Sequence, residues 1–199
     1  MSLCLWIGGW GLSPEQQQQT LSNNWPSVTH KVFYPGELCI TKFVECCDQA
    51  DSLGGYSLGA FLLLRNYAKL PTKPMTLLAP ILDFKAEALL GGRVRGARLA
   101  ILLRWLRRDP VAALNDFYQQ GGIQCSVEQP PYSIEDLIWG IEQLQGSSVD
   151  YWRWENVRGC IGEADALLNG AFMQQVWPEL TILPDAGHDL TELIKETAA

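Results

Sequence analysis

The chain has 199 residues and a mass of 22.2 kDa, which is long enough for the core of one domain with a subdomain inserted into it. Hydrophobic residues make up 47% of the sequence and charged residues 19%, a composition that excludes a disordered tail. With 15 basic and 22 acidic residues the net charge is −7, which argues against a general nucleic-acid-binding protein because phosphate contacts need a basic face.

Apolar runs and helix-forming segments alternate along the chain. In chain order we predict strand 3–7, helix 15–22, strand 29–34, helix 40–50, helix 58–68, strand 75–78, strands 157–161 and 180–183, and helix 189–197. The segment just before Ser57 has only weak strand character, because residues 52–55 include two glycines. Strands that alternate with helices at this spacing predict a parallel α/β sheet.

Residues 84–150 differ in character from the rest of the chain. They consist of helical pieces separated by the pairs Gly91-Gly92, Asp109-Pro110, Gly121-Gly122 and Pro130-Pro131. We therefore predict a core formed by residues 1–83 and 151–199, interrupted by an inserted helical lid at 84–150.

The start of the chain has no basic region, and no apolar run approaches the roughly 18 residues of a membrane-spanning helix. The cysteines form neither a C-x-x-C pair nor a Cys/His cluster with zinc spacing; they are Cys4, Cys39, Cys46, Cys47, Cys125 and Cys160. We expect a cytoplasmic protein with reduced, mostly buried thiols and with no metal site, cofactor or membrane partner.

Residues 55–59 form a G-x-S-x-G motif, Gly-Tyr-Ser-Leu-Gly. In this motif the serine occupies a sharp turn from strand to helix, so that its hydroxyl projects above the sheet, and side chains in place of the glycines would collide with backbone. The helix that follows directs its first amides at a reacting carbonyl. Ser57 is therefore the candidate nucleophile, and an ordinary Gly-Ser turn is the alternative.

A serine hydroxyl is a weak nucleophile and needs a general base. The chain has two histidines. His188 lies in a turn-rich loop just after the predicted strand 180–183, at the strand end where sheets of this class gather their sites. The chain order Ser, Asp, His also selects His188. His30 comes before Ser57 in a predicted strand, and we expect it to be structural or exposed.

The acid that orients this histidine must precede it and follow a strand. Asp165 and Glu163 both follow the predicted strand 157–161. We favour Asp165 because it lies further into the loop, and Glu163 stays as the alternative. The carboxylate would accept the imidazole N–H, fix the tautomer and stabilise the imidazolium.

The stretch Gly8–Leu12, with the sequence Gly-Gly-Trp-Gly-Leu, follows the first predicted strand. Glycines in such a loop allow a backbone N–H to point at a substrate oxygen. We predict that the amides of Trp10 and Leu58 form an oxyanion hole. A plain turn with a core tryptophan is the competing interpretation.

Together these motifs resemble the α/β-hydrolase superfamily, and within it the pimeloyl-acyl-carrier-protein methyl ester esterases of biotin synthesis. The stretches that carry the resemblance are Trp6–Leu12, Gly55–Ala60, Leu77–Pro80, Gly162–Asp165 and Ala186–His188. The resemblance implies an α/β-hydrolase fold and a serine-dependent carboxylic ester hydrolase that forms an acyl-enzyme through a Ser-His-Asp triad. A general carboxylesterase, a thioesterase or C–C hydrolase with the same triad, and a non-catalytic binding protein are the alternatives.

The sequence departs from these relatives at two points. Gly8 stands where they usually have a histidine, so we expect different hydrogen bonds in this loop. The chain also begins at the strand that precedes the oxyanion loop, without the two strands that usually come first. We therefore expect a trimmed, mostly parallel sheet of about five or six strands flanked by helices.

Six of the 15 basic residues lie in the predicted lid, and all are arginines: Arg93, Arg95, Arg98, Arg104, Arg107 and Arg108. A solvated helix face is one interpretation of this cluster. The other is an anion-recognition patch, because a guanidinium fork suits a phosphate or a carboxylate. The resemblance then implies an acidic acyl-carrier protein as partner, or the carboxylate of a small acyl ester substrate, oriented toward Ser57.

Overall fold

The computed structural model describes residues 2–150 and 154–197. Within these residues six strands form one sheet in the order β2-β1-β3-β4-β5-β6, and every neighbouring pair is parallel. The strands are β1 (Ser2–Ile7), β2 (Val28–Phe33), β3 (Ser52–Tyr56), β4 (Met75–Leu78), β5 (Val157–Gly162) and β6 (Thr181–Leu183). The predicted parallel α/β sheet of about five or six strands is confirmed.

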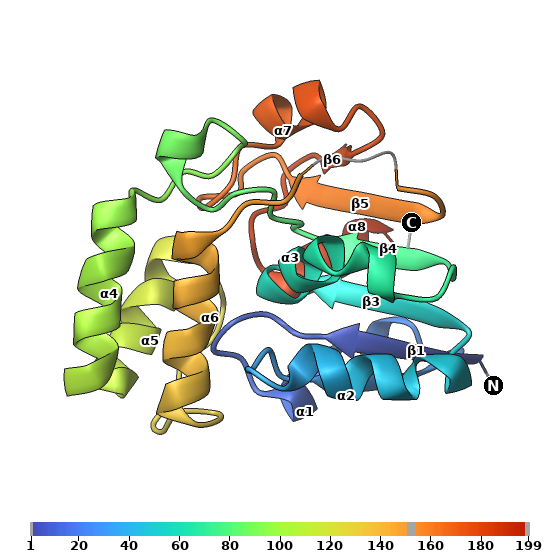
Figure 1. Cartoon of the computed structure of the whole chain (residues 1–199), viewed down its shortest axis with the longest axis horizontal. Helices are drawn as coiled ribbons and strands as arrows, with labels where there is room; N and C mark the ends of the chain where they lie inside the picture. Colours follow the sequence, from blue (N-terminus) through green and yellow to red (C-terminus); the bar gives the residue numbers. More distant parts are fainter. Residues whose placement is uncertain (1, 151–153, 198–199) are drawn as a thin grey trace.

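Helices cover both faces of this sheet (Figure 1). Two of them, α2 (Cys39–Cys46) and α3 (Leu58–Arg65), lie over one face, and α1 (Pro14–Asn24) and α8 (Leu190–Thr197) lie over the other. Because both faces are covered, β1 is apolar and buried at every position from Cys4 to Ile7 rather than at alternate positions. Among the described helices, none is long and apolar enough to cross a membrane.

The predicted helices differ from the structure in extent and in one omission. The helices expected at 40–50 and 58–68 end earlier, and each is followed by a single 3-10 turn, Cys47–Gln49 and Tyr67–Lys69. Helix α7 (Gly170–Val176) was not predicted. It is short, and its start is marked only by Asn169, whose side chain accepts a hydrogen bond from the amide of Phe172 at 3.1 Å.

Strand β3 forms in spite of its two glycines, and it lies between β1 and β4 in the centre of the sheet. A Cβ atom at Gly54 would lie 2.3 Å from the indole of Trp6 on β1. The tryptophan ring therefore occupies the space that a side chain would need. Packing against Trp6 overrides the low strand propensity of glycine, which is why the sequence signal was weak.

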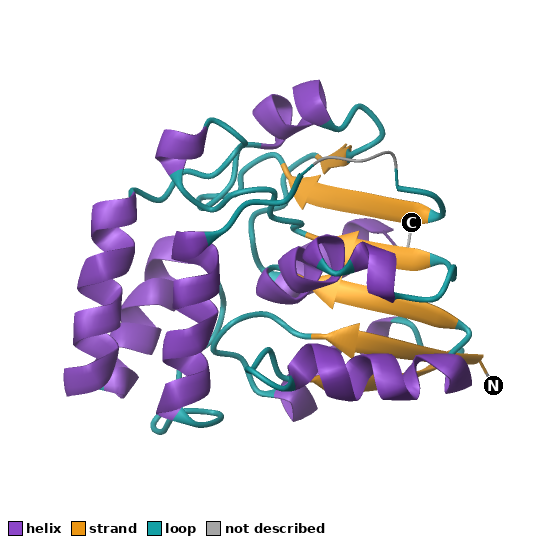
Figure 2. Ribbon diagram, in the orientation of Figure 1, coloured by secondary structure: helices purple, strands orange, loops and turns teal. Residues whose placement is uncertain are grey.

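Residues 84–150, which we predict to be inserted and call the inserted segment, lie beyond the carboxyl ends of the strands (Figures 1 and 2). It contains α4 (Gly96–Arg108), α5 (Pro110–Gly121) and α6 (Ile134–Gly146). Helix α5 starts at a predicted break, where the Asp109 side chain accepts from the Ala112 amide at 3.0 Å. Residues 151–153, where the second core segment is expected to begin, lie outside the described residues, so that boundary stays a prediction.

All six cysteines are free thiols, and four of them are buried. Burial raises the pKa of Cys4 to about 11 and the pKa values of Cys39 and Cys160 to about 12. These thiols therefore stay protonated near neutral pH and act as small apolar side chains. Of the adjacent pair, Cys47 is buried and Cys46 is partly exposed.

His30 is buried on β2, where its role is structural. Its Nδ1 accepts a hydrogen bond from the indole Nε1 of Trp6 at 3.1 Å, so the ring proton lies on Nε2, which is 3.2 Å from the carbonyl oxygen of Trp25. Desolvation lowers the pKa of His30 below the usual value for histidine. The neutral imidazole is thus the form that the fold accommodates.

We expect the free energy of unfolding to fall as the pH drops below about 6.5, because the unfolded chain then takes up a proton at His30 that the folded chain disfavours. A His30→Gln variant keeps one acceptor and one donor but cannot titrate. It should lose less stability than the unsubstituted protein between about pH 7.5 and about pH 5.5, as measured by urea unfolding. Equal losses in the two proteins would contradict this role of His30.

Candidate active site

Ser57 occupies the turn between β3 and α3. Its backbone angles, φ 53° and ψ −114°, are uncommon for a residue with a side chain and are the strained geometry expected of a nucleophile on a sharp strand-to-helix turn. The Ser57 amide donates to the carbonyl oxygen of Leu78 on β4 at 2.9 Å. A Cβ at Gly59 would lie 2.0 Å from the carbonyl oxygen of Ile7, so α3 reaches its position against β1 only with glycine there.

Ser57, His188 and Asp165 form one chain of hydrogen bonds. Oγ of Ser57 lies 2.9 Å from Nε2 of His188, and Nδ1 of His188 lies 2.7 Å from Oδ2 of Asp165. His188 and Asp165 are buried, and Ser57 is 8% exposed. Because an ionised carboxylate only accepts, the imidazole proton lies on Nδ1, and the lone pair of Nε2 faces the serine hydroxyl. The structure thus brings together the residues expected as nucleophile, base and acid.

The buried carboxylate of Asp165 has partners for both oxygens. Oδ1 accepts from the amides of Leu167 and Leu168 at 2.8 and 2.9 Å, while Oδ2 faces His188. These charge-assisted hydrogen bonds offset the cost of removing the carboxylate from water. Glu163, the alternative acid, is exposed at the beginning of the same loop.

The loop that carries His188 is held from two sides. The hydroxyl of Tyr56 donates to the carbonyl oxygen of His188 at 2.7 Å, and burial raises the pKa of this phenol well above its usual range, so it stays a donor. Asp189, the residue before α8, accepts from the backbone amide of Thr191 at 2.8 Å. It also accepts from the backbone amide of Gln124, in the inserted segment, at 2.9 Å. No pattern in the sequence points to this contact of Tyr56, because its partner is 132 residues away.

Gln17 of α1 fills the space beside Gly8 and organises the loop at the end of β1. A Cβ at Gly8 would lie 2.5 Å from Nε2 of Gln17. Oε1 of Gln17 accepts from the amide of Gly9 at 2.9 Å, and Nε2 donates to the carbonyl oxygen of Leu12 at 3.4 Å. A glutamine from the following helix thus makes the hydrogen bonds of this loop. It was missed because a run of four glutamines does not reveal which of them faces inward.

The two amides predicted as oxyanion donors, those of Trp10 and Leu58, have no acceptor among the described residues. The amides on either side of Trp10 are occupied, since Gly9 donates to Gln17 and Gly11 donates to the hydroxyl of Tyr132 at 2.6 Å. For the Trp10 amide itself, no acceptor is found in the part of the chain that the structure describes. The Leu58 amide is the first of α3, where helix geometry provides no partner.

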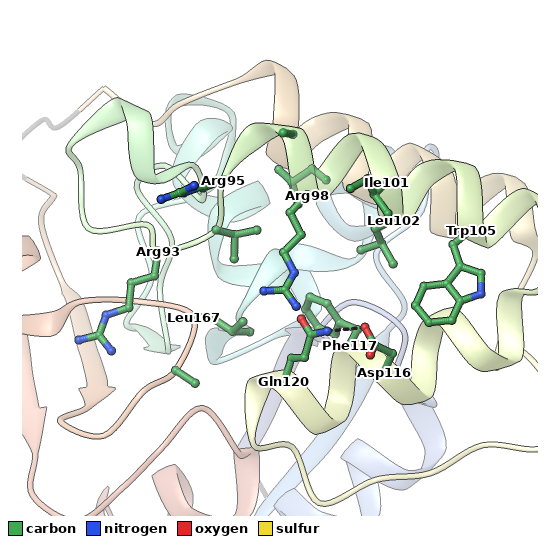
Figure 3. Close-up of a pocket in the computed structure, with 14 residues that line it drawn as sticks. Arg93, Arg95, Arg98, Ile101, Leu102, Trp105, Asp116, Phe117, Gln120 and Leu167 are labelled. Carbon is green, nitrogen blue, oxygen red and sulfur yellow. Dashed lines mark hydrogen bonds between the residues drawn. The ribbon is translucent and has the colours of Figure 1, made fainter.

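The six arginines of the inserted segment divide into two groups. Arg93, Arg95 and Arg98 line a cavity of about 610 Å³ between α4, α5 and the loop that follows Asp165 (Figure 3). The remaining three are exposed on α4 and do not line this cavity: Arg104, Arg107 and Arg108. Arg107 lies 3.6 Å from Glu142 of α6, in an exposed ion pair.

The cavity combines an apolar lining with charge near the candidate site. Its apolar wall includes Leu102, Trp105 and Phe117, and Figure 3 shows Arg98 extending from α4 toward α5. Phe117 packs edge-on against Trp10 with ring centroids 4.8 Å apart. Arg93 donates to the carbonyl oxygen of Asp165 at 2.8 Å. The cavity therefore adjoins the oxyanion loop and the acid loop, although neither Ser57 nor His188 lines it.

This arrangement is suited to nucleophilic acyl transfer. The imidazole can remove the serine proton, the carboxylate can stabilise the resulting imidazolium, and two free amides can bind an oxyanion. Among the described residues, no group of three or more His, Cys, Asp or Glu side chains could hold a metal ion.

No protein-family model and no curated protein sequence matches this chain. Solved structures do match it. BioG from Haemophilus influenzae is 15% identical with a TM-score of 0.51, over 94% of this chain and 88% of that one. The bottromycin epimerase BotH is 11% identical with a TM-score of 0.68, over 98% and 86%. An epoxide hydrolase of the α/β-hydrolase superfamily, from metagenomes of hot environments, is 11% identical with a TM-score of 0.59, over 98% and 86%.

These similarities show that the chain has the α/β-hydrolase fold. At such low identity they show the fold alone. An epimerase and an epoxide hydrolase share this architecture, so the chemistry of the chain has to be argued from its own side chains.

Gly59 offers a test of the close contact beneath Ser57. A Gly59→Ala substitution should lower the free energy of unfolding by about 3 kcal/mol, because its Cβ would overlap backbone rather than a mobile side chain. Gly146→Ala is the matched control, since nothing lies within 4 Å of a Cβ at the end of α6, and it should change stability by less than about 1 kcal/mol. Similar urea unfolding curves for the two variants would refute the constraint at Gly59.

Proposed function

We propose that the chain is a serine-dependent carboxylic ester hydrolase. The observation that carries this proposal is the buried chain from Ser57 Oγ through both nitrogens of His188 to Asp165. A histidine with this pair of partners can accept a proton on Nε2 while its Nδ1–H stays paired with a carboxylate. The strained conformation of Ser57 supports the same assignment.

In the first half of the reaction, His188 Nε2 takes the proton of Ser57 while Oγ attacks the ester carbonyl carbon. The carbonyl oxygen becomes negatively charged and accepts hydrogen bonds from the Trp10 and Leu58 amides. The imidazolium then gives its proton to the departing alkoxide, so that an alcohol leaves and an acyl-enzyme remains. In the second half, His188 activates a water that attacks the acyl group, and the acid leaves as Ser57 recovers its proton.

For the substrate, we propose the methyl ester of pimeloyl-acyl-carrier protein in a cytoplasmic pathway, as the sequence resemblance implies. The two groups of arginines in the inserted segment support this choice. The cavity lined by Arg93, Arg95 and Arg98 adjoins the site and has an apolar wall, which suits an acyl chain near an anionic group. The exposed Arg104, Arg107 and Arg108 form a positive surface on a negatively charged protein, which suits an acidic carrier. A general carboxylesterase or thioesterase would use the same Ser57 chemistry.

The triad is tested with a serine-directed fluorophosphonate and with simple esters. The unsubstituted protein should be labelled stoichiometrically at Ser57 and should hydrolyse p-nitrophenyl esters, whereas Ser57→Ala should lose both. Asp165→Asn should lower kcat by about 10⁴-fold, because the amide no longer holds the imidazole in the required tautomer.

Glu163→Gln is the matched control for the acid, since it removes a carboxylate from the same loop at an exposed position. It should leave kcat within about twofold of the unsubstituted value. Full activity of Ser57→Ala would disprove the mechanism. A protein that neither hydrolyses esters nor takes the label would instead be a non-catalytic binding protein of this fold.

Docking of a carrier is tested by charge reversal on α4. Arg104→Glu with Arg107→Glu should raise KM about tenfold for a methyl ester on a carrier protein and leave the free acyl methyl ester unaffected, because these side chains lie outside the cavity. Arg158→Glu, near the amino end of β5, is the control, because it reverses an arginine charge at the end of the strands opposite the inserted segment. Equal effects on free and carrier-bound esters would argue against docking through this surface.

A further inference from the structure

The oxyanion loop is bound to the inserted segment through the residue after Trp10. The amide of Gly11 donates to the hydroxyl of Tyr132 at 2.6 Å, and the hydroxyl of Tyr118 donates to the carbonyl oxygen of Gly11 at 2.5 Å. Tyr118 lies on α5 and Tyr132 lies just before α6. Two phenols from different elements therefore hold the two backbone polar groups of one residue.

The side chain of Trp10 is held by the same segment. Its indole Nε1 donates to the carbonyl oxygen of Leu137 on α6 at 2.8 Å. A Cβ at Gly140, one turn further along α6, would lie 2.7 Å from the indole of Trp10 and 2.8 Å from the side chain of Leu58. Helix α6 thus packs against both residues whose amides are the proposed oxyanion donors.

Both phenols are suited to a permanent structural contact. Burial raises the pKa values of Tyr118 and Tyr132 above the usual range for tyrosine, so both hydroxyls stay protonated at any ordinary pH. Tyr118 is almost completely buried. The ring of Tyr132 is stacked on that of Tyr34, with centroids 4.8 Å apart, which limits its movement.

We propose that Tyr118 and Tyr132 are positioning residues, which set the direction of the Trp10 amide from the inserted segment. This inference rests on the proposed function, because it assigns them a role in oxyanion binding. The Trp10 amide lies between two amides that side chains hold, Gly9 by Gln17 and Gly11 by Tyr132. With both neighbours fixed, the peptide that carries the Trp10 N–H has little freedom to turn away from the carbonyl oxygen at Ser57.

The inserted segment also contacts the other two loops of the site. The backbone amide of Gln124 donates to the carboxylate of Asp189, next to His188, at 2.9 Å. Arg93 donates to the carbonyl oxygen of Asp165 at 2.8 Å. The oxyanion, acid and base loops therefore each hydrogen-bond to residues 84–150, so this segment supports all three loops of the site.

The experiment compares Tyr118→Phe and Tyr132→Phe with the unsubstituted full-length protein, using p-nitrophenyl esters and fluorophosphonate titration of active sites. Each variant keeps the ring and loses one hydroxyl. Each should lower kcat per titrated site by about tenfold or more, with KM changed by less than about twofold, because the oxyanion forms only in the transition state. A boronic acid, which forms a tetrahedral adduct with a serine, should bind more weakly by a similar factor.

Tyr67→Phe is the matched control, since its hydroxyl also bonds backbone, at Glu155, far along the chain from the oxyanion loop. It should leave kcat per titrated site unchanged. If the two test variants lose titratable sites but keep kcat per site, or behave like Tyr67→Phe, the positioning role is wrong while the esterase proposal stands. If the unsubstituted protein shows neither turnover nor labelling, the proposed function fails and the positioning role fails with it.

Discussion

The carbonyl oxygen of Ile7 and the α carbon of Gly59 lie so close that no side chain fits between them. This contact joins the end of β1 to the first turn of α3. Ile7 is the last residue before the oxyanion loop, and Gly59 comes two residues after Ser57. One close approach therefore fixes the nucleophile and the proposed donor loop relative to each other. The strained backbone of Ser57, which costs on the order of 1–3 kcal/mol, is supported by this packing and by the hydrogen bond from its amide to Leu78.

The two histidines are both buried, but their surroundings favour different protonation states of the ring. His30 is paired with an indole N–H and a carbonyl oxygen, which together satisfy a neutral ring, and desolvation disfavours its protonation. His188 is paired with a hydroxyl and a carboxylate, and the carboxylate can stabilise a positive ring. Asp165 is itself supported by two backbone amides. The difference between a structural and a proposed catalytic histidine thus lies in one charged neighbour.

Features encoded locally could be predicted, and those that depend on distant partners could not. The elbow at Ser57 and the loops of Asp165 and His188 are each marked by a short motif beside an apolar run. In contrast, Tyr118 and Tyr132 meet Gly11 across 107 and 121 residues, with no pattern that points to the contact. Strand β3 was a weak prediction for the same reason, since Gly54 is explained only by the ring of Trp6 and Gly55 only by the close approach of Ala60 on α3. The division of the arginines could not be predicted, because closeness in sequence does not show which of them precede α4 or which side of that helix the others occupy.

Access to Ser57 follows from these contacts. Ser57 is 8% exposed, so the structure around it leaves little of the residue open to solvent. A rigid outward movement of the inserted segment would break its hydrogen bonds to Gly11, Asp165 and Asp189 together, at about 1 kcal/mol for each bond, and would leave buried groups such as the Tyr118 hydroxyl without partners. Such an opening would also release the Trp10 amide from the proposed oxyanion site. Phe117 lies between the arginine-lined cavity and Trp10 and makes none of these hydrogen bonds. The same contacts that limit a rigid movement of the inserted segment therefore keep the oxyanion, acid and base loops assembled.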